Sequence, residues 1–66
     1  MDKRKAKKLL FTVQEKYIQA IKCFERADHF GRYGQTTKAL NKRDEGMDKI
    51  RKAEAAIAEL EALIDQ

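Results

Sequence analysis

Two side chains in this sequence have the chemistry of a nucleophile and its base, the thiol of Cys23 and the imidazole of His29. Thiol catalysis needs the two groups within hydrogen-bond reach, because the imidazole must accept the proton of the sulfur. On one helix their spacing places them about 120° apart around the axis, so they cannot share a proton. We therefore interpret Cys23 as a small apolar residue and His29 as a cation near the C-terminal end of a helix.

Patterns that hold metals, cofactors or phosphates do not occur in the chain. With one cysteine and one histidine, it has neither an intrachain disulfide nor a cysteine-based zinc cluster. There is no calcium-loop pattern. The segment FGRYG, residues 30–34, lacks the following lysine of a phosphate-binding loop. A chain of 66 residues also encloses little volume for a substrate. We predict that the protein is not an enzyme and uses no cofactor or metal.

The elements that position these residues are predicted to be long helices. The chain has no proline and 39% of its residues are charged, and its apolar residues recur at helical spacing. Nothing from Asp2 to about Asp28 breaks a helix. In this segment a set of apolar residues falls within one arc of about 120°. These residues are Leu10, Val13, Tyr17, Ala20, Ile21, Phe24 and Ala27.

The segment HFGRYGQTT, residues 29–37, contains two of the three glycines. Glycine adopts the left-handed conformation at little cost, so a glycine past the last apolar residue ends a helix. We expect the hydroxyl of Thr36 or Thr37 to cap a second helix. The sequence predicts a single domain, residues 1–66, with a helix at about 2–29, a turn at about 30–35 and a helix at about 36–65.

The second predicted helix carries two rows of residues spaced by seven. One row is Ile50, Ile57 and Ile64, and the other is Ala39, Gly46, Ala53 and Leu60. A strict seven-residue repeat indicates a left-handed supercoil against a partner helix. Because glycine inside a helix costs about 1 kcal/mol relative to alanine, we expect close packing at Gly46 to compensate.

An antiparallel fold about residues 32 and 33 explains Gly46 by packing large residues over small ones. It places Tyr17 over Gly46, and it pairs Phe24 with Ala39 and Leu10 with Ala53. We therefore predict an all-α, antiparallel two-helix hairpin of the coiled-coil type.

Opposite charges at the two ends of the chain favour the same arrangement. Residues 1–8 contain five basic residues against one acidic residue, and residues 53–66 contain four acidic residues and no basic one. Each cluster opposes the dipole of its own helix. An antiparallel hairpin brings the clusters together, so we expect each to neutralise the other.

The first helix has more apolar surface than one partner helix covers. Phe11 and Ile18 lie seven residues apart and widen its apolar arc to about 200°. A chain of this size also gains little net stability from its own core. We predict a homodimer that forms a four-helix bundle, with Phe11, Ile18 and Ile21 in the interface. The alternative is that Phe11 and Ile18 dock a different protein.

For function, the sequence favours a small regulator or adaptor that binds another protein through a helical face, with lysines that recognise acidic groups. The alternative is a nucleic-acid-binding regulator, because the net charge is +4 and the pI is about 9.4. Against it, acidic residues alternate with the basic ones, and Glu45–Lys49 and Asp48–Lys52 are favourable helical pairs. The predicted contacts to nucleic acid are Lys3, Arg4, Lys5, Lys7, Lys8, Arg32, Tyr33, Lys38, Lys42 and Arg43.

A membrane partner ranks third. The longest apolar run near the N-terminus is Leu9–Phe11, which is too short for a signal peptide or a membrane span. We expect a cytoplasmic protein with a reduced thiol.

Overall fold

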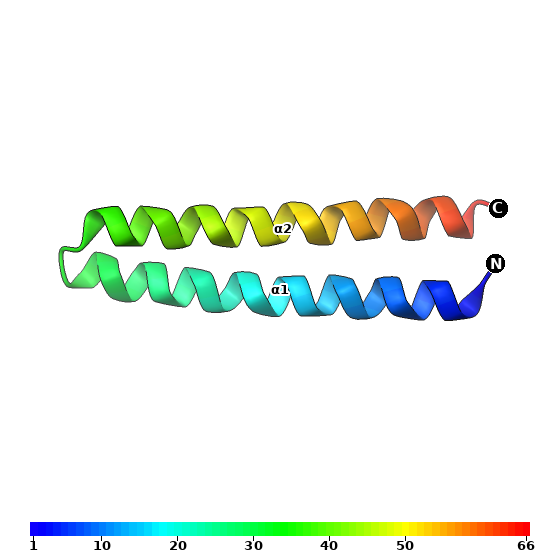
Figure 1. Ribbon diagram of the computed structural model, residues 1–66, viewed down its shortest axis with the longest axis horizontal. Coiled ribbons are helices and arrows are strands. Elements are labelled where there is room, and N and C mark those ends of the chain that lie inside the picture. Colours follow the sequence, from blue (N-terminus) through cyan, green and yellow to red (C-terminus); the bar gives the residue numbers. More distant parts are fainter.

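The computed structural model describes all residues, 1–66, as two antiparallel helices side by side (Figure 1). Helix α1 spans Lys3–Arg32 and helix α2 spans Thr36–Ile64. The hairpin is a rod whose backbone measures about 50 × 13 × 9 Å. Both termini lie at one end, which we call the open end, and the turn forms the tip. The predicted all-α antiparallel hairpin is confirmed.

The turn begins three residues later than predicted, because Gly34 and not Gly31 ends α1. Gly34 is the one residue with positive φ, at 73°. Its N–H donates to the carbonyl of Gly31 at 3.2 Å, and the N–H of Gln35 donates to the carbonyl of Phe30 at 2.9 Å. These two bonds form a Schellman motif, which satisfies carbonyls at the end of the helix.

The two helices begin differently. The carboxylate of Asp2 caps α1 by accepting hydrogen bonds from the backbone N–H groups of Arg4, at 3.0 Å, and Lys5, at 3.3 Å. The predicted threonine cap of α2 is wrong. Gln35 occupies the N-cap position without a side-chain hydrogen bond. The Schellman turn starts α2 directly after Gln35, so Thr36 already lies within the helix.

The contact between the helices, which we call the seam, follows alternating spacings of three and four residues. This spacing is the a and d pattern of a heptad repeat. Every residue of the seam is buried or half-buried. The seam consists of Ala6, Leu9, Val13, Lys16, Ala20, Cys23, Ala27 and Phe30 from α1, and of Ala39, Lys42, Gly46, Lys49, Ala53, Ala56, Leu60 and Leu63 from α2.

Half of the seam positions hold alanine, glycine or cysteine, and these include most of the buried ones. Fully buried positions are four alanines, Gly46 and Leu63. Alanine and glycine let two helix backbones approach closely, because they put few atoms between them. A core of this kind buries few large apolar groups, so the hairpin gains little hydrophobic stabilisation from its own interior.

The predicted contact at Gly46 is confirmed, but its partner is Phe24 and not Tyr17. A Cβ atom built on Gly46 would lie 2.7 Å from Cε1 and 2.9 Å from Cζ of Phe24. At the adjacent residues, the thiol of Cys23 lies 3.9 Å from Oε2 of Glu45. Continuing α1 to Arg32 moves the tip toward Gly34 and shifts the pairing by one heptad. The predicted pairs with Ala39 and Ala53 are therefore wrong by the same shift.

We expect Gly46→Ala to lower the free energy of unfolding when residue 24 is phenylalanine and to raise it when residue 24 is alanine. With Phe24 present, over-packing of about 1–3 kcal/mol outweighs the gain in helix propensity of about 1 kcal/mol, and the free energy of unfolding falls. In a Phe24→Ala background the added methyl group has room, so the same substitution raises the free energy of unfolding by about 1 kcal/mol. Urea unfolding of the four variants at one protein concentration, followed by circular dichroism, measures both effects. An equal effect of Gly46→Ala in the two backgrounds would contradict the contact.

Candidate interaction surface

Outside the seam, the two sides of the hairpin differ in character. We take Ala6 and Ala39 as heptad positions a of their helices. Because the helices are antiparallel, the e positions of both lie on one side of the seam and the g positions of both lie on the other. The heptad register of the fold therefore decides which residues share a side.

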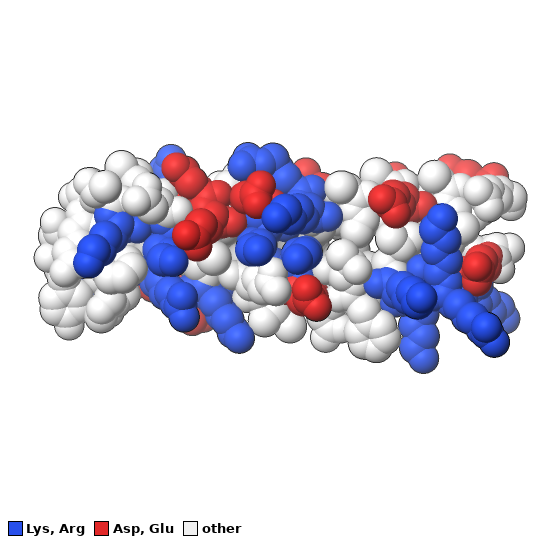
Figure 2. All heavy atoms as spheres, viewed as in Figure 1, with Lys and Arg blue, Asp and Glu red and all other residues white.

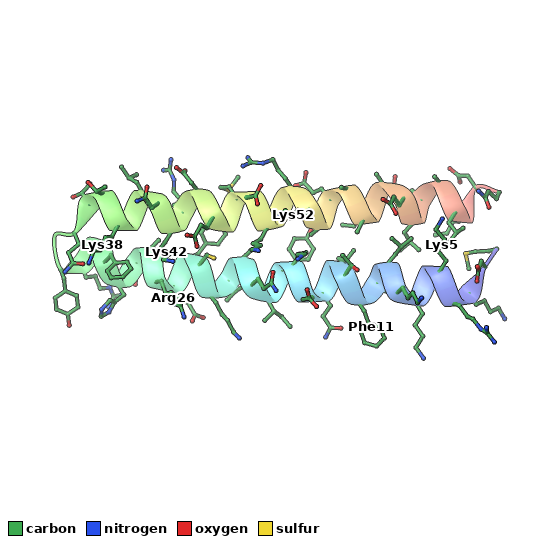
Figure 3. All side chains as sticks on the ribbon, in the orientation of Figure 1. Lys5, Phe11, Arg26, Lys38, Lys42 and Lys52 are labelled. Atoms are coloured by element: carbon green, nitrogen blue, oxygen red, sulfur yellow. The ribbon has the colours of Figure 1, made fainter.

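The g side is charged, and we call it the polar face. Figure 2 shows basic and acidic side chains mixed along this side of the rod. Figure 3 labels its residues Lys5, Arg26, Lys38 and Lys52, together with Lys42 from the seam. No g position within either helix holds an exposed large apolar residue. Tyr33 continues the g row of α1 and is 71% exposed, but it lies in the turn.

The opposite side carries most of the exposed large apolar residues, together with some charged ones, and we call it the apolar face. It is built from b and e positions, which form a second pattern of three- and four-residue spacings next to the seam. Six of its large side chains are exposed, and Phe24, Ile50 and Ile57 are half-buried beside the seam. The exposed members are Leu10, Tyr17, Ile21, Leu40, Met47 and Ile64.

A third surface, the outer strip, consists of Phe11 and Ile18 at f positions of α1. Phe11 is 61% exposed and Ile18 is 46% exposed. Figure 3 shows Phe11 pointing outward from α1, away from α2. The ring stands between two shallow hollows. One is lined by Lys7, Leu10, Phe11 and Gln14, and the other by Phe11, Gln14, Glu15, Ile18, Gln19 and Lys22.

The structure places the three predicted interface residues on two different surfaces. Phe11 and Ile18 form the outer strip, and Ile21, at 56% exposure, belongs to the apolar face. All three are open to a partner, since α2 covers none of them. Their role in an interface stays a prediction.

The predicted nucleic-acid contacts are divided between the two ends of the rod. Lys3, Arg4, Lys5, Lys7 and Lys8 belong to the first turns of α1 at the open end, and the remaining residues lie at or near the tip. Two residues of the tip group are already paired. Arg32 Nε lies 3.0 Å from Asp28 Oδ2, and Lys42 Nζ lies 3.2 Å from Glu45 Oε2.

Basic residues that the sequence reasoning missed lie between these groups. Lys16 occupies a d position of the seam, with 23% of its side chain exposed, and Arg26 stands on the polar face. Lys16 and Lys42 bury their stems along the seam while their ammonium groups reach Glu15 and Glu45, and Lys49 is half-buried in the same seam. These lysines and the alanines recur at alternating spacings of three and four residues. That pattern in the sequence could have identified the lysines as seam residues.

All four ion pairs of the molecule join residues of the same helix. The predicted pair Asp48–Lys52 is present at 3.2 Å, and the hydrogen bond from Lys52 lowers the pKa of the Asp48 carboxyl. The predicted pair Glu45–Lys49 is absent, and Glu45 pairs with Lys42 instead. The basic and acidic clusters meet at the open end (Figure 1), but no ion pair links them.

Cys23 and His29 are held apart by different neighbours. The thiol of Cys23 lies against Glu45 in the seam. The imidazole of His29 packs against the rings of Tyr33, at 4.8 Å between centroids, and Phe30, at 5.7 Å. No group of three or more histidine, cysteine, aspartate or glutamate side chains is arranged to hold a metal ion.

Neither helix has the length and apolar character needed to cross a membrane. No family model, curated protein or solved structure matches the chain. The surfaces described above are therefore the basis for a functional proposal.

Proposed function

We propose that the protein is a non-enzymatic regulator or adaptor that binds another protein through its outer strip. The observation that supports this most is the position of Phe11, a large aromatic side chain that is 61% exposed and points away from the rest of the molecule. Aromatic side chains dominate the binding energy of protein interfaces when they fill a pocket of the partner. Phe11 and Ile18 are spaced as anchors of a helix that lies in a groove.

The charges around the strip favour an acidic partner. Basic residues surround Phe11 on α1, and none of those at positions 4, 7, 8 and 22 is engaged in an ion pair. Of the acidic residues near the strip, Glu15 is paired with Lys16 at 3.6 Å, and Glu25 lies one heptad beyond Ile18. An apolar groove bordered by aspartate or glutamate side chains would match both the ring and the free cations.

We also propose that the chain acts as a homodimer, a four-helix bundle in the cytoplasm. The seam buries only alanines, a glycine and one leucine, which supports the need for further apolar burial. A second copy on the apolar face would bury large side chains that the hairpin leaves exposed. In such a bundle the f positions point outward, so the outer strip stays available to a partner protein.

Substitution of both anchors should remove the partner without unfolding the hairpin. We expect Phe11→Asp with Ile18→Asp to keep the circular dichroism of the parent, because both side chains are exposed. We expect it to raise the dissociation constant for the partner at least tenfold, since loss of an interface anchor costs about 2 kcal/mol or more. Photo-crosslinking through a benzoylphenylalanine at position 11 identifies the partner, and titration with the purified partner measures the constant.

The matched control is Ala55→Asp with Ala62→Asp. These residues have the same spacing, receive the same charges and are exposed on α2. The control should bind as the parent does. Equal binding by the control and by the Phe11 and Ile18 variant would remove the outer strip as the docking site.

Nucleic acid is the second candidate partner, supported by the basic side chains that run along the polar face in Figure 2. Phosphates would contact lysine and arginine, and binding would weaken steeply as salt increases. The acidic residues between these cations, and the ion pairs of Lys42 and Lys52, count against this candidate.

A salt series with generic duplex DNA and structured RNA separates the two candidates. If the outer strip is the functional surface, we expect no micromolar binding at low salt. Micromolar binding that falls steeply with salt, and that Arg26→Glu with Lys52→Glu abolishes, would favour nucleic acid instead. The Phe11 and Ile18 variant serves as the control, because it leaves the polar face unchanged.

A further inference from the structure

We infer that the second copy lies on the apolar face with its tip at the same end as the tip of the first, so that α1 packs against α2 of the other copy. This inference rests on the proposed homodimer. Two face-to-face arrangements keep all neighbouring helices antiparallel. With the tips together, the two-fold axis is parallel to the helices. With the tips opposite, the axis is perpendicular to them, and each helix packs against its own copy.

The register of the hairpin fixes which residues would meet when the tips are together. An axis parallel to the helices leaves every residue at its own level along the rod, so facing residues are those at one level within the hairpin. In an antiparallel hairpin, the residue numbers of two residues at one level add to nearly the same value throughout. This sum is 70 for Phe24 and Gly46 and 68 for Cys23 and Glu45. The pairing between copies follows from these contacts.

At this register the b positions of α1 and α2 match in chemistry. Lys7 comes level with Glu61, Gln14 with Glu54, and Ile21 with Met47, and the numbers of each pair add to 68. A cation thus faces a carboxylate, an amide faces a carboxylate, and an apolar side chain faces an apolar one. At the e positions, Leu10 comes level with Ile57 and Tyr17 with Ile50, so apolar side chains face each other there.

Two levels are mismatched, Asp28 with Leu40 beside the tip and Lys3 with Ile64 at the open end. Asp28 is held by Arg32 at 3.0 Å and is exposed, so its charge is already satisfied. Lys7 and Glu61, by contrast, take part in no ion pair within the hairpin. Both are exposed and free to pair with a second copy.

With opposite tips the two copies of α1 match at Lys7 and Asp28, but the two copies of α2 do not match. When two copies of α2 overlap fully, Leu40 meets Glu61 and Met47 meets Glu54. Both levels occur twice by symmetry and place a carboxylate against an apolar side chain, which is unfavourable because the carboxylate loses water without gaining a partner. Charge complementarity therefore favours the tips together.

The distance between the two tips tests this inference. A spin label at Tyr33→Cys, in a Cys23→Ala background that keeps the label unique, lies in the exposed turn. With the tips together, dipolar spectroscopy should give a label distance below half of the 50 Å length of the rod. With the tips opposite, the labels would lie about 50 Å or more apart, which would overturn the inference.

Sedimentation of the same sample separates the failure of this inference from that of the proposed homodimer. A monomer at all concentrations would reject the homodimer and this inference with it, but would leave binding through Phe11 and Ile18 in place. A dimer with distant tips would reject the orientation alone. Ile21→Lys should yield a monomer, and a dimer that persists in this variant would exclude the apolar face.

Charge reversal tests independently whether Lys7 of one copy faces Glu61 of the other. Lys7→Glu alone and Glu61→Lys alone should each weaken self-association by roughly tenfold, because two like-charged pairs replace two opposite ones. A mixture of the two variants should form heterodimers with the affinity of the parent, since each Lys7→Glu helix then faces a Glu61→Lys helix. Heterodimers as weak as the homodimers would mean that these residues do not face each other.

Discussion

The contact between the ring of Phe24 and the backbone at Gly46 controls how the two helices align. A side chain at position 46 would put an atom 2.7 Å from that ring, so the ring fits only where the facing helix has no Cβ. The chain has a single glycine inside α2, and therefore this contact selects one register among those that the heptads allow. The seam, the polar face and the apolar face all follow from that register.

A seam of alanines and a glycine forces the large apolar residues of both helices outward. Close approach of the backbones leaves no room for leucine, isoleucine or phenylalanine in most of the centre, and these residues occupy the flank instead. Because the helices are antiparallel, the flanking apolar residues of both gather on one side. Six large apolar residues are therefore exposed on that side, and the polar face has none in its helices. The surfaces that we propose for binding result from how the interior is packed.

Electrostatics contributes little to the hairpin itself. Its ion pairs are exposed or partly exposed and stay within one helix, where solvent screening leaves each of them a small contribution to stability. At seam positions, the aliphatic part of each lysine side chain packs between the helices, and its charged end lies at the edge of the seam. The charges that remain free, at the open end and around Phe11, suit contacts with other molecules better than contacts within the chain.

The sequence alone predicted the two helices, their antiparallel order and the need for close packing at Gly46. It could do so because helical periodicity and the cost of a helical glycine are local properties. The exposure of Phe11 and Ile18 also followed, since their angle on α1 lies outside any single contact. Only the tertiary structure decided the partner of Gly46, the place of Lys16 and Lys49 in the seam, and the joining of Ile21 with Met47 in one face. These depend on where the turn begins. Gly34 and not Gly31 ends α1, and the partner of Gly46 lies one heptad further along α1 than predicted. A seven-residue repeat alone does not distinguish registers that are one heptad apart.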